Sequence, residues 1–409
     1  MKMHDFMSAA KQADFVFTTG IDVIPEYQRV LGHNRVYHLH FAAQPKYHNP
    51  LEKFTREDKF CFAGTYYHTH KERSAFFDEI AYYLIDKKGL DIYARNYKHE
   101  PYADMVFPER YNRFILGELR PDEIEKAYKA YYCNINLNTI SQSKSMFSRR
   151  VFELMASNTI VVGNYSRGLK NYFGDLTISV TGVGEMRDKL RQYCPDEASI
   201  KKYRLPGLRK VLTGHLYEDR LAYIVKKVFG RDLLPAMPSI TVFAKTKSGK
   251  ESNYVLSCFE RQSYPHKQLV LNPEGTCCVS GYAGYAGVFH PDDYYCGNYL
   301  TDLALSARWA DCGGIGKSLY YAKTDEGIAL RGAFGYQTVS VLSPRRAIFK
   351  SEWLSNKTID QLLSAETIVS SNEFVSVDEL NYCENTNDPN EIFADLLILN
   401  QGEAEENQE

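Results

Sequence analysis

The chain has 409 residues, enough for two domains that each bury a core of their own. Hydrophobic residues make up 44% and charged residues 24%, as is typical of soluble globular proteins. The formal net charge of −2 excludes bulk electrostatic attraction to nucleic acid or to an anionic membrane.

The nine cysteines show no CxxC pair, and neither a secretory signal peptide nor an apolar run of about 18 residues is present. We therefore expect reduced thiols, no transmembrane segment and a cytoplasmic protein. Peripheral attachment to the inner face of the membrane is compatible with this expectation.

The first expected elements are a strand at 13–18, a helix at 22–31 that ends at Gly32, and a strand at 35–41. They form one βαβ unit, which is too small to bury its own faces. We interpret residues 1–54 as the remnant of a Rossmann-like domain. Its open strand edge is expected to self-associate or to be completed by a partner chain.

From Lys59 onward, strands alternate with helices up to Gly230, which predicts a parallel, doubly wound α/β sheet in a domain at 55–230. The expected strands are 59–66, 91–95, 114–119, 133–139, 159–164 and 176–180. The expected helices are 71–88, one opened by Pro121, 148–157, and several up to Gly230 that include an amphipathic stretch at 207–229.

The stretch at 231–239 contains two prolines and is predicted to be a linker. A strand from Ile240, a helix at 251–262 and a strand at 267–272 then open a second, smaller α/β domain, at 240–383. Residues 384–409 are polar and acidic, and we expect a tail with a disordered end.

The first candidate ligand motif is FAGTYYHTHKER at 62–73. Gly64 permits a close backbone approach at the end of a strand, and Lys71 and Arg73 place positive charge in the first turn of the following helix, where phosphates bind. His68 and His70 lack a third ligand, so we interpret them as part of a solvated turn.

The second candidate motif is SQSKSMFSRRVFELMASNTIVVGN at 141–164, a serine-rich loop that runs into a helix. Two arginines in the first helical turn favour binding of a diphosphate, and a carboxylate one turn later can accept hydrogen bonds from a ribose. The alternative is a surface ion pair between Arg149 and Glu153. The candidate donor-binding residues are Gly64, Arg73, Ser145, Ser148, Arg149, Arg150 and Glu153.

The run FSRRVFELMASNTIVV resembles the donor-site helix of GT-B glycosyltransferases, especially the CgeB-like, spore-maturation group. FAAQPKYHNP at 41–50, FAGTYY at 62–67 and HLYEDRLAYI at 215–224 fit the same group in order, so the resemblance covers about residues 13–228. It implies that Glu153 holds the nucleotide ribose, that the preceding basic and serine residues face the diphosphate, and that the incomplete amino-terminal domain belongs to the acceptor side.

This chain has Asn158-Thr159-Ile160 where the GT-B family usually has Gly-x-Pro. Asparagine is the best replacement for glycine in a left-handed turn, so we expect the helix cap to be kept.

The second domain resembles a reduced family-2, GT-A-type glycosyltransferase, through its opening ITVFAK and the Gln-Ser-Tyr-Pro turn. Its acidic stretch offers only Asp292 and Asp293, and Pro273-Glu274 replaces the usual nucleotide-contacting aspartates. The sequence thus favours a non-catalytic domain, with these two aspartates as weak metal candidates. Mg²⁺ or Mn²⁺ would be needed only if this domain were active.

The resemblance implies a hexosyltransferase-type enzyme that moves a sugar from a nucleotide-sugar, such as a UDP-sugar, to a cell-surface glycan or polymer precursor. The GT-B chemistry needs no cofactor, and no catalytic residue can be named. The alternative is a non-catalytic nucleotide-sugar-binding or scaffolding subunit of a polysaccharide-assembly complex.

Overall fold

The computed structural model describes residues 3–97, 105–233, 237–274 and 276–387. Two compact units divide the chain: unit 1 holds the described residues of 1–50 and 54–235, and unit 2 holds those of 51–53 and 236–396. The predicted linker at 231–239 and the predicted tail at 384–409 lie partly outside the described residues.

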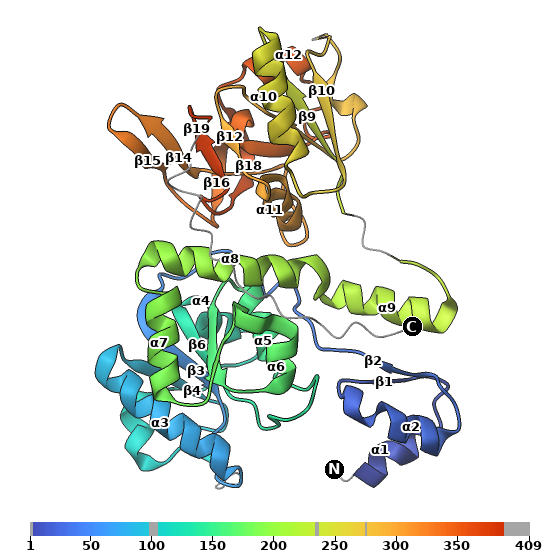
Figure 1. Cartoon of the computed structure of the whole chain (residues 1–409), viewed down its shortest axis with the longest axis vertical. Helices are drawn as coiled ribbons and strands as arrows, with labels where there is room; N and C mark the ends of the chain where they lie inside the picture. The colour runs from blue at the N-terminus through green and yellow to red at the C-terminus, as the bar shows by residue number, and fades with distance from the viewer. Residues whose placement is uncertain (1–2, 98–104, 234–236, 275, 388–409) are drawn as a thin grey trace. The chain divides into compact units, whose positions relative to one another are not determined.

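Unit 1 is built on a six-stranded sheet in the order β5-β4-β3-β6-β7-β8, in which every neighbouring pair is parallel (Figure 1). This confirms the predicted doubly wound α/β class. The strands are β3 (Glu57–Gly64), β4 (Leu90–Ala94), β5 (Ile115–Gly117), β6 (Tyr131–Asn136), β7 (Ile160–Asn164) and β8 (Ile178–Val180).

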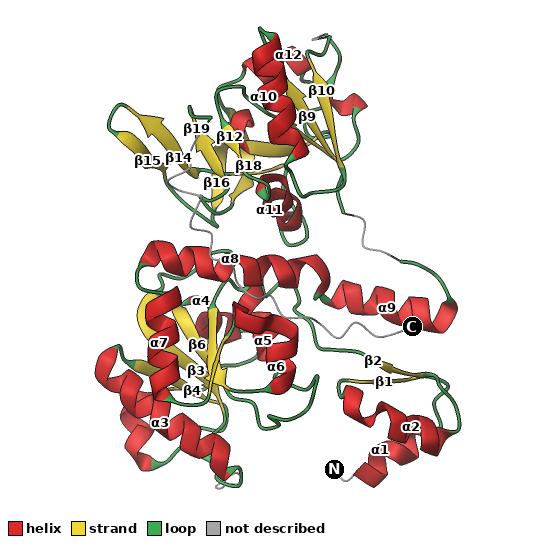
Figure 2. Ribbon diagram, viewed as in Figure 1, coloured by secondary structure: helices red, strands yellow, loops and turns green. Residues whose placement is uncertain are grey.

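Helices cover both faces of this sheet, with α3 and α7 on one side of the strands and α5 and α6 on the other (Figure 2). Successive residues of β3, Phe60 to Gly64, are all buried, as expected for a strand packed on both faces. The helices are α3 (Lys71–Lys87), α4 (Ile124–Lys129), α5 (Arg150–Ala156), α6 (Arg167–Phe173), α7 (Val183–Tyr193), α8 (Glu197–Gly214) and α9 (Tyr217–Phe229).

The amphipathic stretch at 207–229 is divided between two helices, because α8 ends at Gly214 and α9 begins at Tyr217. The backbone between them pairs with an earlier segment instead: Ala43 donates its N–H to His215 O, and Tyr217 donates its N–H to Ala43 O. These tertiary hydrogen bonds take the place of helical ones.

The amino-terminal segment forms the predicted βαβ unit, and its two strands pair in parallel from Val16↔Val36 to Thr18↔His38. Its α2 ends, as predicted, at Gly32, which has a φ of 72°. The elements are α1 (Met3–Ala10), β1 (Val16–Thr18), η1 (Ile21–Val23), α2 (Ile24–Leu31) and β2 (Val36–His38).

Unit 2 contains a seven-stranded mixed sheet in the order β10-β9-β11-β17-β13-β18-β16 and a four-stranded sheet in the order β12-β19-β14-β15. The opening βαβ is present as predicted, with β9 and β10 parallel, and the helix between them is α10 (Gly249–Glu260). The first sheet comprises β9 (Ile240–Ala244), β10 (Lys267–Leu271), β11 (Tyr285–Val288), β13 (Gly314–Gly316), β16 (Thr338–Leu342), β17 (Ala347–Lys350) and β18 (Ile368–Ser376). The second comprises β12 (Tyr294–Tyr295), β14 (Leu319–Thr324), β15 (Gly327–Gly332) and β19 (Tyr382–Glu384), and the remaining helices are α11 (Tyr299–Ser306) and α12 (Ile359–Ser364).

Each unit has a core cluster of its own, centred on residues such as Phe62 and Phe77 in unit 1 and Phe243 and Phe349 in unit 2. Among the helices that the structure describes, none combines the length and the apolarity needed to cross a membrane.

Candidate functional site

A cavity of about 300 Å³ lies at the carboxyl edge of the parallel sheet in unit 1. Its wall is formed by the residues that follow β3, β4 and β6, where open α/β sheets bind ligands. The lining residues are Thr65, Tyr67, Arg73, Arg95, Leu137, Asn138, Thr139, Ile140, Met146, Phe147, Ser148 and Arg150.

Three arginines and no acidic residue line this cavity. Arg73, in the first turn of α3, is buried, donates from Nη1 to Thr65 O at 3.1 Å and lies 4.8 Å from the centroid of the Tyr67 ring. Burial lowers the pKa of Arg73 to about 10, and the positive charge of Arg150 adds to this lowering. Two guanidinium groups that repel each other where water is partly excluded attract an anion.

Gly64 leaves room for the Arg150 side chain. A Cβ atom at Gly64 would lie 2.8 Å from the Phe62 ring and 3.3 Å from Arg150 Nη2. The Arg150 guanidinium lies 5.9 Å from the centroid of the same Phe62 ring. Gly64 therefore makes space for a side chain of the site, although it does not line the arginine cavity itself. The predicted close approach of its backbone to a phosphate stays a prediction.

The two candidate serines have different positions. Ser148 lines the cavity, and its N–H donates to Asn138 Oδ1 at 3.0 Å. Ser145 is buried outside the lining: its Oγ accepts from Ile21 N–H and donates to Thr19 O, both at 2.9 Å. Ser145 thus ties the 141–148 loop to the amino-terminal segment.

Arg149 and Glu153 also lie outside the lining of the cavity. Arg149 Nε contacts Glu153 Oε1 at 2.7 Å, and the Tyr128 hydroxyl donates to Glu153 Oε2 at 2.7 Å. The Glu153 side chain is only 8% exposed, so both of its oxygens are engaged within the protein. The ion pair that the sequence offered as an alternative is present.

Sequence reasoning missed Arg95 and Asn138. Arg95 directly follows β4, and a basic residue at the carboxyl end of a strand beside β3 was the available signal. Asn138 accepts from Ser148 N–H, and its own N–H donates to Asn164 Oδ1 at 2.7 Å. Asn134 and Asn136 alternate along β6, and Asn138 follows the strand at the same spacing, so the run CNINLNT could have indicated this polar row.

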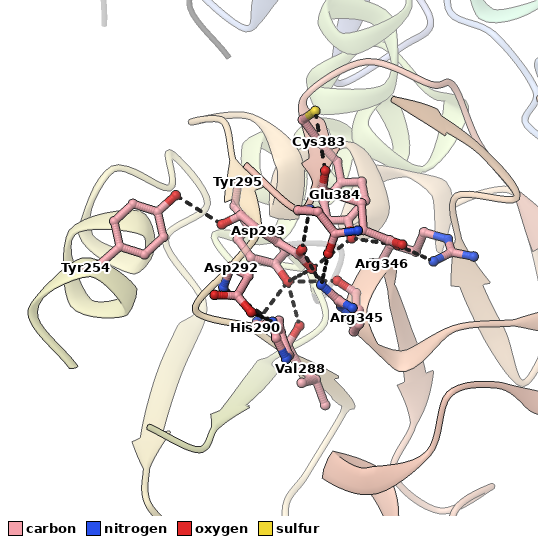
Figure 3. Close-up of polar contacts among 12 residues, drawn as sticks. Tyr254, Val288, His290, Asp292, Asp293, Tyr295, Arg345, Arg346, Cys383 and Glu384 are labelled. Carbon is pink, nitrogen blue, oxygen red and sulfur yellow. Dashed lines mark hydrogen bonds and ion pairs between the residues drawn. The ribbon is translucent and has the colours of Figure 1, made fainter. Parts of the chain in front are cut away.

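Of the two metal candidates of unit 2, Asp292 and Asp293, only Asp293 is held by several protein groups (Figure 3). Asp293 is fully buried, and Arg345 donates to its two oxygens from Nε at 2.9 Å and Nη2 at 2.5 Å. The Tyr382 hydroxyl and the Asn385 N–H add bonds of 2.9 and 3.0 Å. Asp292 is 71% exposed. Within the described residues no group of three or more His, Cys, Asp or Glu side chains could hold a metal ion.

Comparison with solved structures finds partial overlaps. TarM overlaps at a TM-score of 0.39 and 14% identity, covering 55% of this chain and 45% of that chain. A variant of S. aureus TarM in complex with Fondaparinux, alpha-GlcNAc-glycerol and UDP overlaps at a TM-score of 0.40 and 14% identity, covering 55% of this chain and 45% of that chain. The GtfA/B complex overlaps at a TM-score of 0.36 and 14% identity, covering 56% of this chain and 48% of that chain. The chain spans less than half the length of each of these chains.

No curated protein matches the chain. Residues 73–226 match the family model described as glycosyl transferase-like. This range contains Arg73, Arg95 and Arg150, the three arginines of the cavity. The segment that supplies the positive charge of the site is therefore the segment that is similar to this family model.

Proposed function

We propose that the chain is a glycosyltransferase that binds the diphosphate of a nucleotide-sugar, such as a UDP-sugar, among Arg73, Arg95 and Arg150. The supporting observation is a cavity at the carboxyl edge of a parallel sheet that holds three guanidinium groups and no acidic residue. A diphosphate replaces the repulsion between these groups with charge-assisted hydrogen bonds.

The same groups suit the chemistry of sugar transfer. A hydroxyl oxygen of the acceptor forms a bond to the anomeric carbon of the sugar and gives up its proton. The bond between that carbon and the diphosphate oxygen breaks, and negative charge grows on the departing nucleoside diphosphate. Fixed guanidinium groups stabilise that charge most strongly when it is fully developed, so they favour the transition state over the bound donor. We propose a cell-surface glycan or polymer precursor as the acceptor, in line with the resemblance to the CgeB-like group.

Thermal denaturation of the full chain with UDP and with pyrophosphate tests the donor site. Both ligands should raise the melting temperature, because they bind only the folded state. Arg95→Ala and Arg150→Ala should each weaken UDP binding at least about tenfold, equivalent to about 1.4 kcal/mol. Arg95 is exposed, so its removal should not disturb the core. EDTA should not change the response.

Arg187→Ala is the matched control, since Arg187 lies on α7 outside the cavity and pairs with Asp188. The ribose contact of Glu153, which the resemblance to the CgeB-like group implies, requires that the carboxylate exchange its bond to Arg149 or Tyr128 for the ribose hydroxyls. If it does, Glu153→Gln should reduce the response to UDP and leave the response to pyrophosphate intact. Equal UDP responses in the wild type and both cavity variants would contradict the proposal.

A further inference from the structure

Unit 2 contains a second cavity, of about 780 Å³, which the proposed donor site does not use. Both tryptophans of the chain, Trp309 and Trp353, line it. Asp311, Lys350 and Glu352 are also part of its wall. A concave site with aromatic walls and a few polar groups is typical of small-ligand binding.

This cavity is separate from the acidic loop of unit 2. Lys350, at the end of β17, pairs with Tyr285, the first residue of β11. The acidic residues Asp292 and Asp293 follow the other end of β11, which finishes at Val288. The tryptophan cavity therefore lies at the opposite edge of the sheet from the stretch that resembles a GT-A metal motif.

The Trp353 ring is held in place by its neighbours. A Cβ atom at Gly313 would lie 2.8 Å from Trp353 Cδ1, so the indole packs directly on the Gly313 backbone. Phe349 is stacked with it at 6.2 Å and 19°, and Phe374 meets it edge-on at 5.1 Å and 76°. A fixed aromatic wall loses little conformational entropy when a ligand binds.

The charges of the cavity favour a neutral, hydroxyl-rich ligand. Asp311 and Lys350 form an ion pair of 2.7 Å, and the Asp311 side chain is 97% exposed. With Glu352 added, the wall carries two carboxylates and one ammonium group, so it offers no excess positive charge to a phosphate. Carboxylates accept hydrogen bonds from sugar hydroxyls, while indole rings cover the apolar C–H faces of pyranoses.

We infer that the tryptophan cavity of unit 2 binds a neutral carbohydrate chain. This site is additional to the nucleotide-sugar site and does not depend on it. Unit 2 would then bind a glycan, and unit 1 would bind the nucleotide-sugar.

The full chain can be screened on an array of neutral hexose and N-acetylhexosamine oligosaccharides, and the glycans that bind can then be titrated in solution. Because both tryptophans line the cavity, intrinsic tryptophan fluorescence reports on this site, and we expect binding to change it. Trp309→Ala should weaken binding at least tenfold. Asp311→Asn and Glu352→Gln, at exposed positions that tolerate substitution, should weaken it severalfold.

Phe334→Ala and Glu366→Gln are the matched controls, since both residues are exposed in unit 2 and lie outside the cavity. They should bind the glycan like the wild type, and so should Arg150→Ala, even if the donor-site proposal fails. The inference is overturned if no neutral glycan binds, if binding survives all three cavity substitutions, or if only UDP changes the tryptophan fluorescence.

Discussion

Two histidines of unit 1, the buried His40 and the half-buried His215, share the aromatic neighbours Phe152 and Tyr172. His40 Nε2 donates to Ser145 O at 2.6 Å, while Arg220 donates to His215 Nδ1 at 2.8 Å. Both arrangements suit neutral imidazoles. Burial lowers the pKa of each histidine from 6.5 to about 3, and the charge of Arg220 contributes to both shifts.

These shifts predict acid destabilisation of unit 1. Below pH 6.5 both histidines bind protons in the unfolded chain but stay neutral in the folded chain. The stability that is present above pH 6.5 is therefore lost as the pH falls toward 3. Each histidine should lower the free energy of unfolding by about 1.4 kcal/mol for each pH unit in this range. Urea unfolding between about pH 6 and about pH 4.5 measures this effect. The free energy of unfolding should depend less steeply on pH in the double variant His40→Gln/His215→Gln than in the wild type. Parallel pH profiles would contradict the assignment.

At the scale of elements, the start and the end of α5 illustrate what the sequence reveals. The expected left-handed turn after the helix is confirmed: Asn158 has a φ of 54°, and Thr159 N–H donates to Leu154 O at 3.0 Å. The serine loop before α5 was harder to predict, because Ser145 finds its partners in the amino-terminal segment, more than a hundred residues away. Local patterns carry no information about such contacts.

The positive φ of Asn158 gives a direct test of the helix end. Asn158→Ala should destabilise the protein by about 1 kcal/mol, because a Cβ-bearing residue without a polar side chain is strained in this conformation. Asn158→Gly should be neutral or stabilising, since glycine relieves that strain and removes a buried Oδ1 that lacks a hydrogen-bond partner. Denaturant unfolding of the wild type and the two variants measures their order of stability. Equal losses of stability in both variants would contradict the prediction.

Across the whole molecule, strand alternation predicted the architecture of unit 1 because a parallel sheet packed on both faces has a strong periodic signature. The same regularity predicted the edge where the arginines meet. Arg73, Ser148 and Arg150 of the lining were among the candidates from the sequence. The ion pair that keeps Arg149 and Glu153 outside the lining was left open by the sequence, and the contribution of Arg95 from a neighbouring strand was missed. In unit 2, the partner of Asp293 lies 52 residues away, beyond the reach of any local motif.

The amino-terminal βαβ segment is joined to the arginine cavity through the 141–148 loop. The N–H of Ile21 and the ring of His40 both bond Ser145, and Asp22 accepts from the Ser143 hydroxyl at 2.6 Å and from Lys144 N–H at 2.9 Å. The same loop continues into Met146, Phe147 and Ser148, which line the arginine cavity. The segment interpreted from sequence as a remnant therefore positions part of the candidate site.

A chain that begins at Ala42 tests this role, since it keeps the pairing of Ala43 with the segment between α8 and α9. It should melt at a lower temperature and lose most of its response to UDP, because the loop no longer has its buried partners. Asp22→Asn is the milder matched variant, expected to weaken UDP binding only slightly. Light scattering of the full chain measures whether the β1–β2 edge recruits a second copy. If the shortened chain keeps both its melting temperature and its UDP response, the amino-terminal segment does not support the site.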